Sequence, residues 1–70
     1  MNTNELKAEI VRHAETSSIL AEVLGVTKAT LSKKLNGKVE FTQSEIGAIK
    51  EHYNLSAERV AEIFFAFDMS

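Results

Sequence analysis

The amino-acid sequence predicts a compact all-α domain built from five short helices. The 70 residues include no proline and only three glycines, so little interrupts helix formation. Apolar residues recur three or four positions apart, the spacing that places side chains on one face of a helix. Residues that cap helix N-termini stand before several of these stretches. A chain of this length supports one hydrophobic core, so we expect a single domain over residues 1–70.

Five helices are expected from these patterns. Their ranges are residues 3–14, 17–24, 28–35, 43–52 and 57–67. The candidate N-caps are Asn2, Thr16, Thr27, Thr42 and Ser56. Glu5 stands three residues after Asn2, which is the spacing of a capping box. Gly25 is expected to end the second helix, because glycine readily adopts the left-handed conformation that follows many helix C-termini, and Asn36-Gly37 closes the third.

The strongest local signal is the run from Phe41 to Ile46. Thr42 and Glu45 have the spacing of a second capping box. Phe41 and Ile46 occupy the two positions of a hydrophobic staple, which fixes the angle at which a chain enters a helix. We therefore expect a well-defined helix start at Thr42.

The apolar positions of the five helices predict the core. The residues expected to point inward are Leu6, Ile10, Ala14, Leu20, Leu24, Leu31, Leu35, Ile46, Ile49, Tyr53, Val60, Ile63, Phe64 and Phe67. Phe65 lies off the apolar stripe of the last helix. Exposed there, it would suit a contact with a second copy or a partner; alternatively, it rests on the first helix.

Charge is distributed unevenly along the chain. The net charge is −2, although the segment from Thr27 to Lys38 carries four lysines and no acid. Those lysines are Lys28, Lys33, Lys34 and Lys38. The remaining four basic residues face ten acids, so the rest of the chain carries 4 − 10 = −6. We expect the lysines to form a basic outer face on a molecule that is otherwise acidic.

The residues from Ser17 to Asn36 have the pattern of a helix-turn-helix. Such a motif needs a small residue where its two helices cross, and Ala21 meets that need. It also needs a glycine at the turn and an apolar residue just after it, which Gly25 and Val26 supply. The apolar residues that would seal the two helices together are Leu20, Leu24 and Leu31. The outer face of the second helix of the motif would then be free to enter a major groove of DNA.

These residues carry a resemblance to a known family. The run Leu20-Ala21-x-x-Leu24-Gly25-Val26-Thr27-x-x-x-Leu31-Ser32, followed by Asn36-Gly37, resembles the phage Cro and repressor helix-turn-helix family. With the sequence after it, the run is most similar to small Cro-like or repressor-modulating regulators of temperate phages of Gram-positive bacteria. The resemblance covers about residues 4–66 and implies a five-helix, lambda-repressor-like DNA-binding domain. Lys34 stands where many members have an apolar core residue.

The resemblance implies roles for individual residues. The DNA-contacting residues that it implies are Ser17, Ser18, Thr27, Lys28, Ala29, Thr30, Ser32, Lys33, Asn36 and Lys38. Lys28, Ala29 and Ser32 match positions that read base edges, and Thr30 and Lys33 flank them. The other five match positions that contact phosphate, start a helix or cap it.

Two functional hypotheses follow. The first is a phage-type transcriptional regulator that binds double-stranded operator DNA in a lysis-lysogeny switch, with two copies bound to a palindromic site. The second is an antirepressor, which would bind a phage repressor by protein–protein contact and alter its DNA binding, because the acidic remainder could cover a basic DNA-reading face. Phe65 is the candidate contact of a homodimer.

Several other classes of function are not expected. The chain has no cysteine, and His13 and His52 stand apart without further ligands, so we expect neither a metal nor a cofactor. No serine has the histidine and acid partners of a catalytic site, so we do not expect an enzyme. No apolar run approaches the roughly 20 residues that cross a bilayer, and the N-terminal residues lack the pattern of a signal peptide. The expected location is the cytoplasm of the bacterial host.

Overall fold

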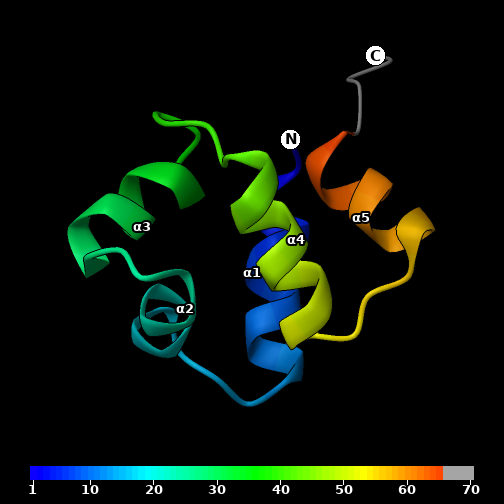
Figure 1. The fold of residues 1–70 in the computed structure, drawn as a ribbon, viewed down its shortest axis with the longest axis horizontal. Helices are drawn as coiled ribbons and strands as arrows, with labels where there is room; N and C mark the ends of the chain where they lie inside the picture. The colour runs from blue at the N-terminus through cyan, green and yellow to red at the C-terminus, as the bar shows by residue number, and fades with distance from the viewer. Residues whose placement is uncertain (66–70) are drawn as a thin grey trace.

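A computed structural model describes residues 1–65, which form five helices and no strands (Figure 1). The helices are α1 (Thr3–Arg12), α2 (Ser17–Leu24), α3 (Lys28–Leu35), α4 (Gln43–His52) and α5 (Ala57–Phe64). The predicted all-α class and the predicted bounds of α2, α3 and α4 are confirmed. The last helix starts at Ala57 as predicted, but the predicted end at residue 67 is wrong, because α5 ends at Phe64 with Phe65 as its C-cap. The expected inward position of Phe67 lies outside the described residues. No helix in the described part is long and apolar enough to span a membrane.

Each helix begins at a side chain that accepts a hydrogen bond from the backbone three residues on. The five caps are Asn2, Thr16, Thr27, Thr42 and Ser56, as predicted. The capping box at α4 is complete, because the Glu45 carboxylate also accepts a hydrogen bond from the backbone N–H of Thr42 at 2.8 Å. The box expected at α1 is only half formed. Glu5 turns instead toward Arg59 of α5, whose Nη1 donates to Glu5 Oε1 at 2.7 Å.

The end of α1 differs from the prediction. The helix stops at Arg12, and Ala14, expected on its inward face, is exposed. Ala14 adopts a positive φ of 56°, and its N–H bonds to the carbonyl of Val11 at 2.9 Å. The N–H of Glu15 then bonds to the carbonyl of Ile10 at 3.0 Å. These bonds satisfy the last carbonyls of α1 with a left-handed residue that is not glycine.

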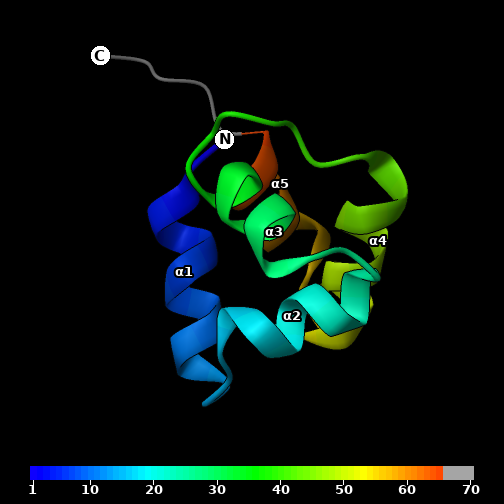
Figure 2. The ribbon, with the colours of Figure 1, turned by 90° about the vertical axis from the view of Figure 1, so that its left-hand side faces the viewer.

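Every helix contributes a side chain to a single core. The fully buried side chains come one from each helix: Leu6, Leu20, Leu31, Ile49 and Ile63. Burial of such a side chain contributes about 1.5–3 kcal/mol. Figures 1 and 2 show α2 and α3 on one side of the molecule, with α3 lying across α2, with α1 and α4 in the middle and with α5 on the opposite side. One side of α3 therefore packs against the core, and its opposite side faces solvent.

Candidate nucleic-acid interface

The connection between α2 and α3 is a tight turn. Gly25 ends α2 with a left-handed φ of 71°, and its N–H bonds to the carbonyl of Glu22 at 3.1 Å. The N–H of Val26 bonds to the carbonyl of Ala21 at 3.0 Å. Glycine suits this position because a Cβ would strain the left-handed backbone. Ala21 and Leu31 are buried, so the two helices seal against each other on their inner sides.

The N-terminus of α3 is held by two threonines. The hydroxyl of Thr27 accepts from the N–H of Thr30 at 3.1 Å and donates to the Thr30 hydroxyl at 3.0 Å. Both roles of the Thr27 hydroxyl are therefore used within the helix cap. Thr27 is therefore the N-cap of α3, as expected, and the half-buried Thr30 bonds to it through both its backbone N–H and its hydroxyl.

The residues expected to contact DNA lie on α2, on α3 and in the segments that adjoin α3. Eight of them are exposed: Ser17, Thr27, Lys28, Ala29, Ser32, Lys33, Asn36 and Lys38. Ser18 and Thr30 are half-buried. The structure thus leaves the outer side of α3 open to solvent, with small side chains alternating with lysines.

Lys34 departs from the expected four-lysine face. Only 5% of this residue is exposed, and its Nζ donates to Glu45 Oε1 at 2.9 Å and to the carbonyl of Glu40 at 3.0 Å. The ammonium also lies 5.6 Å from the centroid of the Phe41 ring. The prediction that Lys34 belongs to the basic outer face is wrong, because the position points to the core side of α3. The outer face therefore carries Lys28, Lys33 and Lys38.

The partner of Lys34 is held as a carboxylate. Burial raises the pKa of Glu45, but hydrogen bonds from Lys34 and from the Thr42 backbone outweigh it, so this pKa lies below its usual value. No motif in the sequence pairs residues 34 and 45. The one sequence signal for the inward lysine is the resemblance given above, in which this position carries an apolar core residue in many members of the family.

The segment after α3 returns over the helix end. Gly37 has a φ of 78°, and its N–H bonds to the carbonyl of Lys34 at 3.1 Å. The N–H groups of Lys38 and Val39 both point to the carbonyl of Lys33, at 2.9 and 3.4 Å. These bonds keep the Lys38 backbone beside the last turn of α3, so two of the exposed lysines of this region are close in space.

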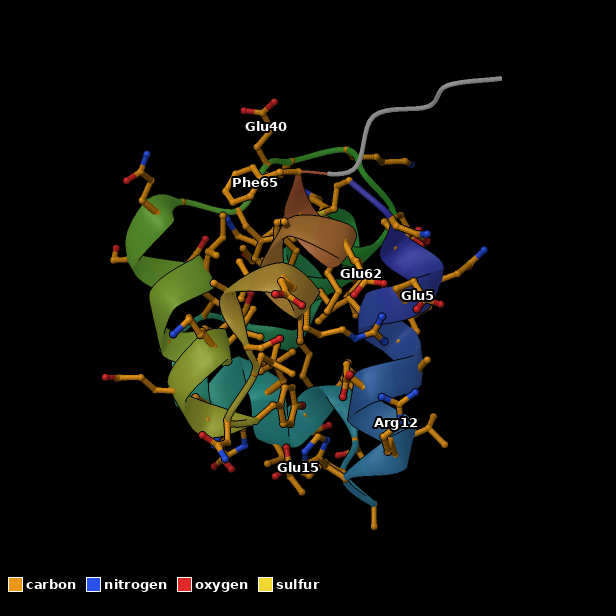
Figure 3. The ribbon with its side chains drawn as sticks, turned by 90° about the vertical axis from the view of Figure 1, so that its right-hand side faces the viewer. Glu5, Arg12, Glu15, Glu40, Glu62 and Phe65 are labelled. Carbon is orange, nitrogen blue, oxygen red and sulfur yellow. The ribbon has the colours of Figure 1, made fainter. Side chains whose placement is uncertain are left out.

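Several carboxylates lie on the side of the molecule away from α3. Figure 3 shows Glu5 on α1 and Glu62 on α5, and Glu15 at the lower edge, in the connection between α1 and α2. Arg59 lies among them, with its Nη1 at 2.7 Å from Glu5 and at 3.7 Å from Glu62. The separation of charge in space is partial, because Glu22 of α2 and Glu40 after α3 are exposed as well. Within residues 1–65, no group of three or more His, Asp or Glu side chains could hold a metal ion.

The two histidines flank a buried tyrosine. The ring centroids of His13 and His52 lie 4.5 and 4.8 Å from that of Tyr53. His52 Nε2 lies 2.9 Å from Glu15, whose carboxylate also accepts from the Tyr53 hydroxyl at 3.1 Å. Burial and the adjacent Glu15 raise the pKa of Tyr53. This cluster joins the α1–α2 turn to the end of α4, on elements that lie outside the candidate interface.

Phe65 is exposed, which agrees with its place off the apolar stripe. It caps the C-terminus of α5 and keeps 56% of its surface in solvent. A hollow of about 270 Å³ opens beside it, lined by Met1, Glu40, Phe41, Ile46, Phe64 and Phe65. An exposed aromatic ring next to an apolar hollow is a surface with the chemistry of a protein contact.

Comparison with known proteins identifies a family. Residues 2–67 match the family described as "Protein of unknown function (DUF739)", and the chain belongs to that family. No curated protein gives a significant match. No solved structure does so either.

Proposed function

We propose that this member of the DUF739 family is a phage-type transcriptional regulator that binds operator DNA. In this proposal α2 and α3 form a helix-turn-helix within a lambda-repressor-like domain, and α3 enters the major groove. The observation that carries the proposal is that α3 has a buried apolar side and an exposed polar side. Its inner side is sealed by Leu31 and Leu35, while Lys28, Ala29, Ser32 and Lys33 stand exposed on its outer side.

The chemistry of the outer side suits DNA. Lysine ammonium groups can donate to guanine O6 and N7 or to phosphate, and the methyl group of Ala29 can contact the methyl group of thymine. Glu5, Glu15 and Glu62 lie away from α3 (Figure 3), so their repulsion of phosphate is reduced by distance and by salt. The sequence resemblance to Cro-like regulators supports the same interpretation.

Two copies on a palindromic site would extend a short contact surface. One α3 reaches few base pairs, and a two-fold pair of helices one turn of DNA apart multiplies specificity. Phe65 is our candidate for the contact between the copies, because it is the most exposed aromatic side chain in the described part.

Selection from random-sequence duplexes tests the proposal without a known operator. We expect enrichment of a palindrome and, for a duplex that contains it, binding that weakens as salt rises. If Lys28, Lys33 and Lys38 each neutralise one phosphate, log Kd changes with log salt by about 2.7 per copy, since each contact contributes roughly 0.9. Failure to enrich any sequence, with all duplexes bound no tighter than roughly 10⁻⁴ M, would refute the proposal.

The burial of Lys34 favours a second candidate function. With that charge removed, the outer side of α3 carries three lysines, and Ser17 and Ser18 offer only short side chains for phosphate contact. The carboxylates of Glu5, Glu15 and Glu62 (Figure 3) could meet the basic DNA-reading face of another protein. The second candidate is therefore an antirepressor that binds a phage repressor. Co-elution with a phage repressor, and release of that repressor from its operator, would select this function over the first.

A further inference from the structure

Lys34 is one of two buried charged residues in the described core, and it is the one that touches the candidate interface. Its backbone belongs to α3, while its side chain reaches the segment that follows α3 and the first turn of α4. Burying an ammonium group costs several kcal/mol unless its donors are satisfied. A buried lysine in a helix that otherwise presents lysines to solvent therefore calls for a structural reason.

The Nζ group of Lys34 has three partners. It donates to Glu45 Oε1 at 2.9 Å and to the carbonyl of Glu40 at 3.0 Å, and it faces the ring of Phe41 at 5.6 Å. The same oxygen of Glu45 accepts the N–H of Thr42 at 2.8 Å. One ammonium thus joins the end of α3, the backbone before α4 and the N-terminal cap of α4.

The segment held by these bonds carries two of the expected phosphate contacts. Residues 36–40 leave α3 through Asn36 and Gly37, and the N–H of Lys38 bonds to the carbonyl of Lys33 at 2.9 Å. This backbone bond fixes the start of the segment. Its end, at Glu40, is held through the carbonyl oxygen that accepts from Lys34. Without the ammonium, that carbonyl would lose its side-chain partner.

We infer that Lys34, paired with Glu45, is a positioning residue that fixes residues 36–40 so that Asn36 and Lys38 are placed to meet a DNA phosphate. The inference rests on the proposed DNA-binding function. Buried ion pairs contribute little net stability, yet they can select one arrangement among several of similar energy. The pair here joins the part of the fold that must be rigid for phosphate contact to a helix that lies outside the interface.

A lysine-to-methionine comparison tests the inference. Lys34→Met keeps the length and apolar stem of the side chain and removes its donors. Lys50→Met, at an exposed position of α4, is the matched control with the same change of charge. The double variant Lys34→Met/Glu45→Gln leaves no buried charge unpaired and keeps an acceptor for the Thr42 N–H. It serves as the test protein if Lys34→Met alone does not fold.

The first readout uses the free protein and needs no DNA. We expect amide hydrogen exchange at Lys38 and Val39 to be about tenfold faster in the Lys34 variants than in Lys50→Met, while the Leu31 amide in α3 is unchanged. Equal exchange rates at Lys38 and Val39 in all proteins would overturn the inference. Because this readout is independent of DNA, it holds even where wild-type protein selects no operator, a result that would refute the proposed function instead.

The second readout separates positioning from contact. With the selected duplex, we expect the Lys34 variants to bind about tenfold more weakly than Lys50→Met and to lose up to about 0.9 of the salt slope, because a displaced Lys38 no longer neutralises its phosphate. Lys38→Met should reduce the salt slope by about 0.9, and adding Lys34→Met to it should reduce the slope no further. A further loss of slope in Lys34→Met/Lys38→Met would show that Lys34 itself contacts phosphate and would overturn the positioning role, as would unchanged affinity of Lys34→Met.

Discussion

Arg59 donates from Nε to Oε1 of Glu9 at 2.8 Å, and this bond joins α5 to α1 across 50 positions of the chain. Glu9 is 2% exposed, and the same oxygen accepts from Arg12 Nη1, also at 2.8 Å. The two arginines differ in burial, since 17% of the Arg59 side chain and 62% of the Arg12 side chain are exposed. Oε1 of Glu9 thus makes two ion pairs of equal length, one with the largely buried Arg59 and one with the exposed Arg12.

Arg59→Met is expected to lower the free energy of unfolding by about 3 kcal/mol, because it leaves the buried Glu9 carboxylate with only the solvent-exposed Arg12 as an arginine partner. Arg12→Met, the matched control, should cost less than about 1 kcal/mol, since an exposed pair is screened by water. Urea unfolding followed by circular dichroism measures both values. Equal losses in the two variants would show that burial does not set the strength of these pairs.

Replacing two glycines by alanine should change stability in opposite directions. A Cβ at Gly25 or at Gly47 would meet no atom within 4 Å, so only the backbone decides. Gly25→Ala should cost about 1–2 kcal/mol, because φ is +71° there. Gly47→Ala should gain about 0.8–1 kcal/mol, because this residue lies inside α4. Thermal unfolding midpoints report both, and a Gly25→Ala protein as stable as wild type would contradict the turn geometry.

Acid should weaken the contact between Glu15 and the end of α4. The hydrogen bond with His52 is the largest cause that lowers the pKa of Glu15; with the bond from Tyr53, it outweighs the opposing effect of burial. Since the folded-state pKa lies below 4.5, the stabilisation is complete above that pH and is lost as pH falls through the folded value.

Glu15→Gln should therefore make the fall in stability between about pH 5 and pH 3 shallower than in wild type. Glu58→Gln, at an exposed carboxylate of α5, is the control. Unfolding midpoints in urea over this range provide the measurement. Parallel pH profiles for wild type and Glu15→Gln would argue against a role for Glu15 in acid sensitivity.

The exposed lysines should differ from other surface lysines in their effect on DNA binding. Lys28→Ala and Lys33→Ala are each expected to weaken binding to the selected duplex and to reduce the salt slope by about 0.9 where the lost contact is to phosphate. Lys50→Ala changes the charge equally on α4. Fluorescence anisotropy at several salt concentrations distinguishes them, and identical behaviour of all three variants would remove α3 from the interface.

Phe65 should influence association of the chain with itself. Phe65→Ser is expected to shift the monomer–dimer equilibrium toward monomer, because it removes an aromatic ring that is 56% exposed. Val11→Ser, at an apolar side chain of α1 that is 75% exposed, is the control. Sedimentation equilibrium measures both. A dimer that persists in Phe65→Ser, or is lost equally in Val11→Ser, would exclude the α5 end as the contact.

The sequence by itself determined the five helix starts. A cap needs only a side-chain oxygen and a backbone N–H three residues later, so Thr16, Thr27, Thr42 and Ser56 act within their own segments. The same holds for Gly25, whose left-handed turn is a local property. The end of α1 escaped prediction because Ala14 carries no such signal.

Only the tertiary structure decided which charged groups remain on the surface. The sequence places Lys34 in a run of lysines expected on the surface, yet its side chain is buried and bonds to Glu45, 11 positions away. Glu5 has the spacing of a capping box, yet its carboxylate turns to Arg59, 54 positions away. Such choices depend on which partners the packed helices bring within about 3 Å, and sequence spacing carries no information about distances between helices. The sequence thus predicted which residues lie at the candidate interface. The packing of the helices decided the charge of that interface, because it buried Lys34 and left Lys28, Lys33 and Lys38 exposed.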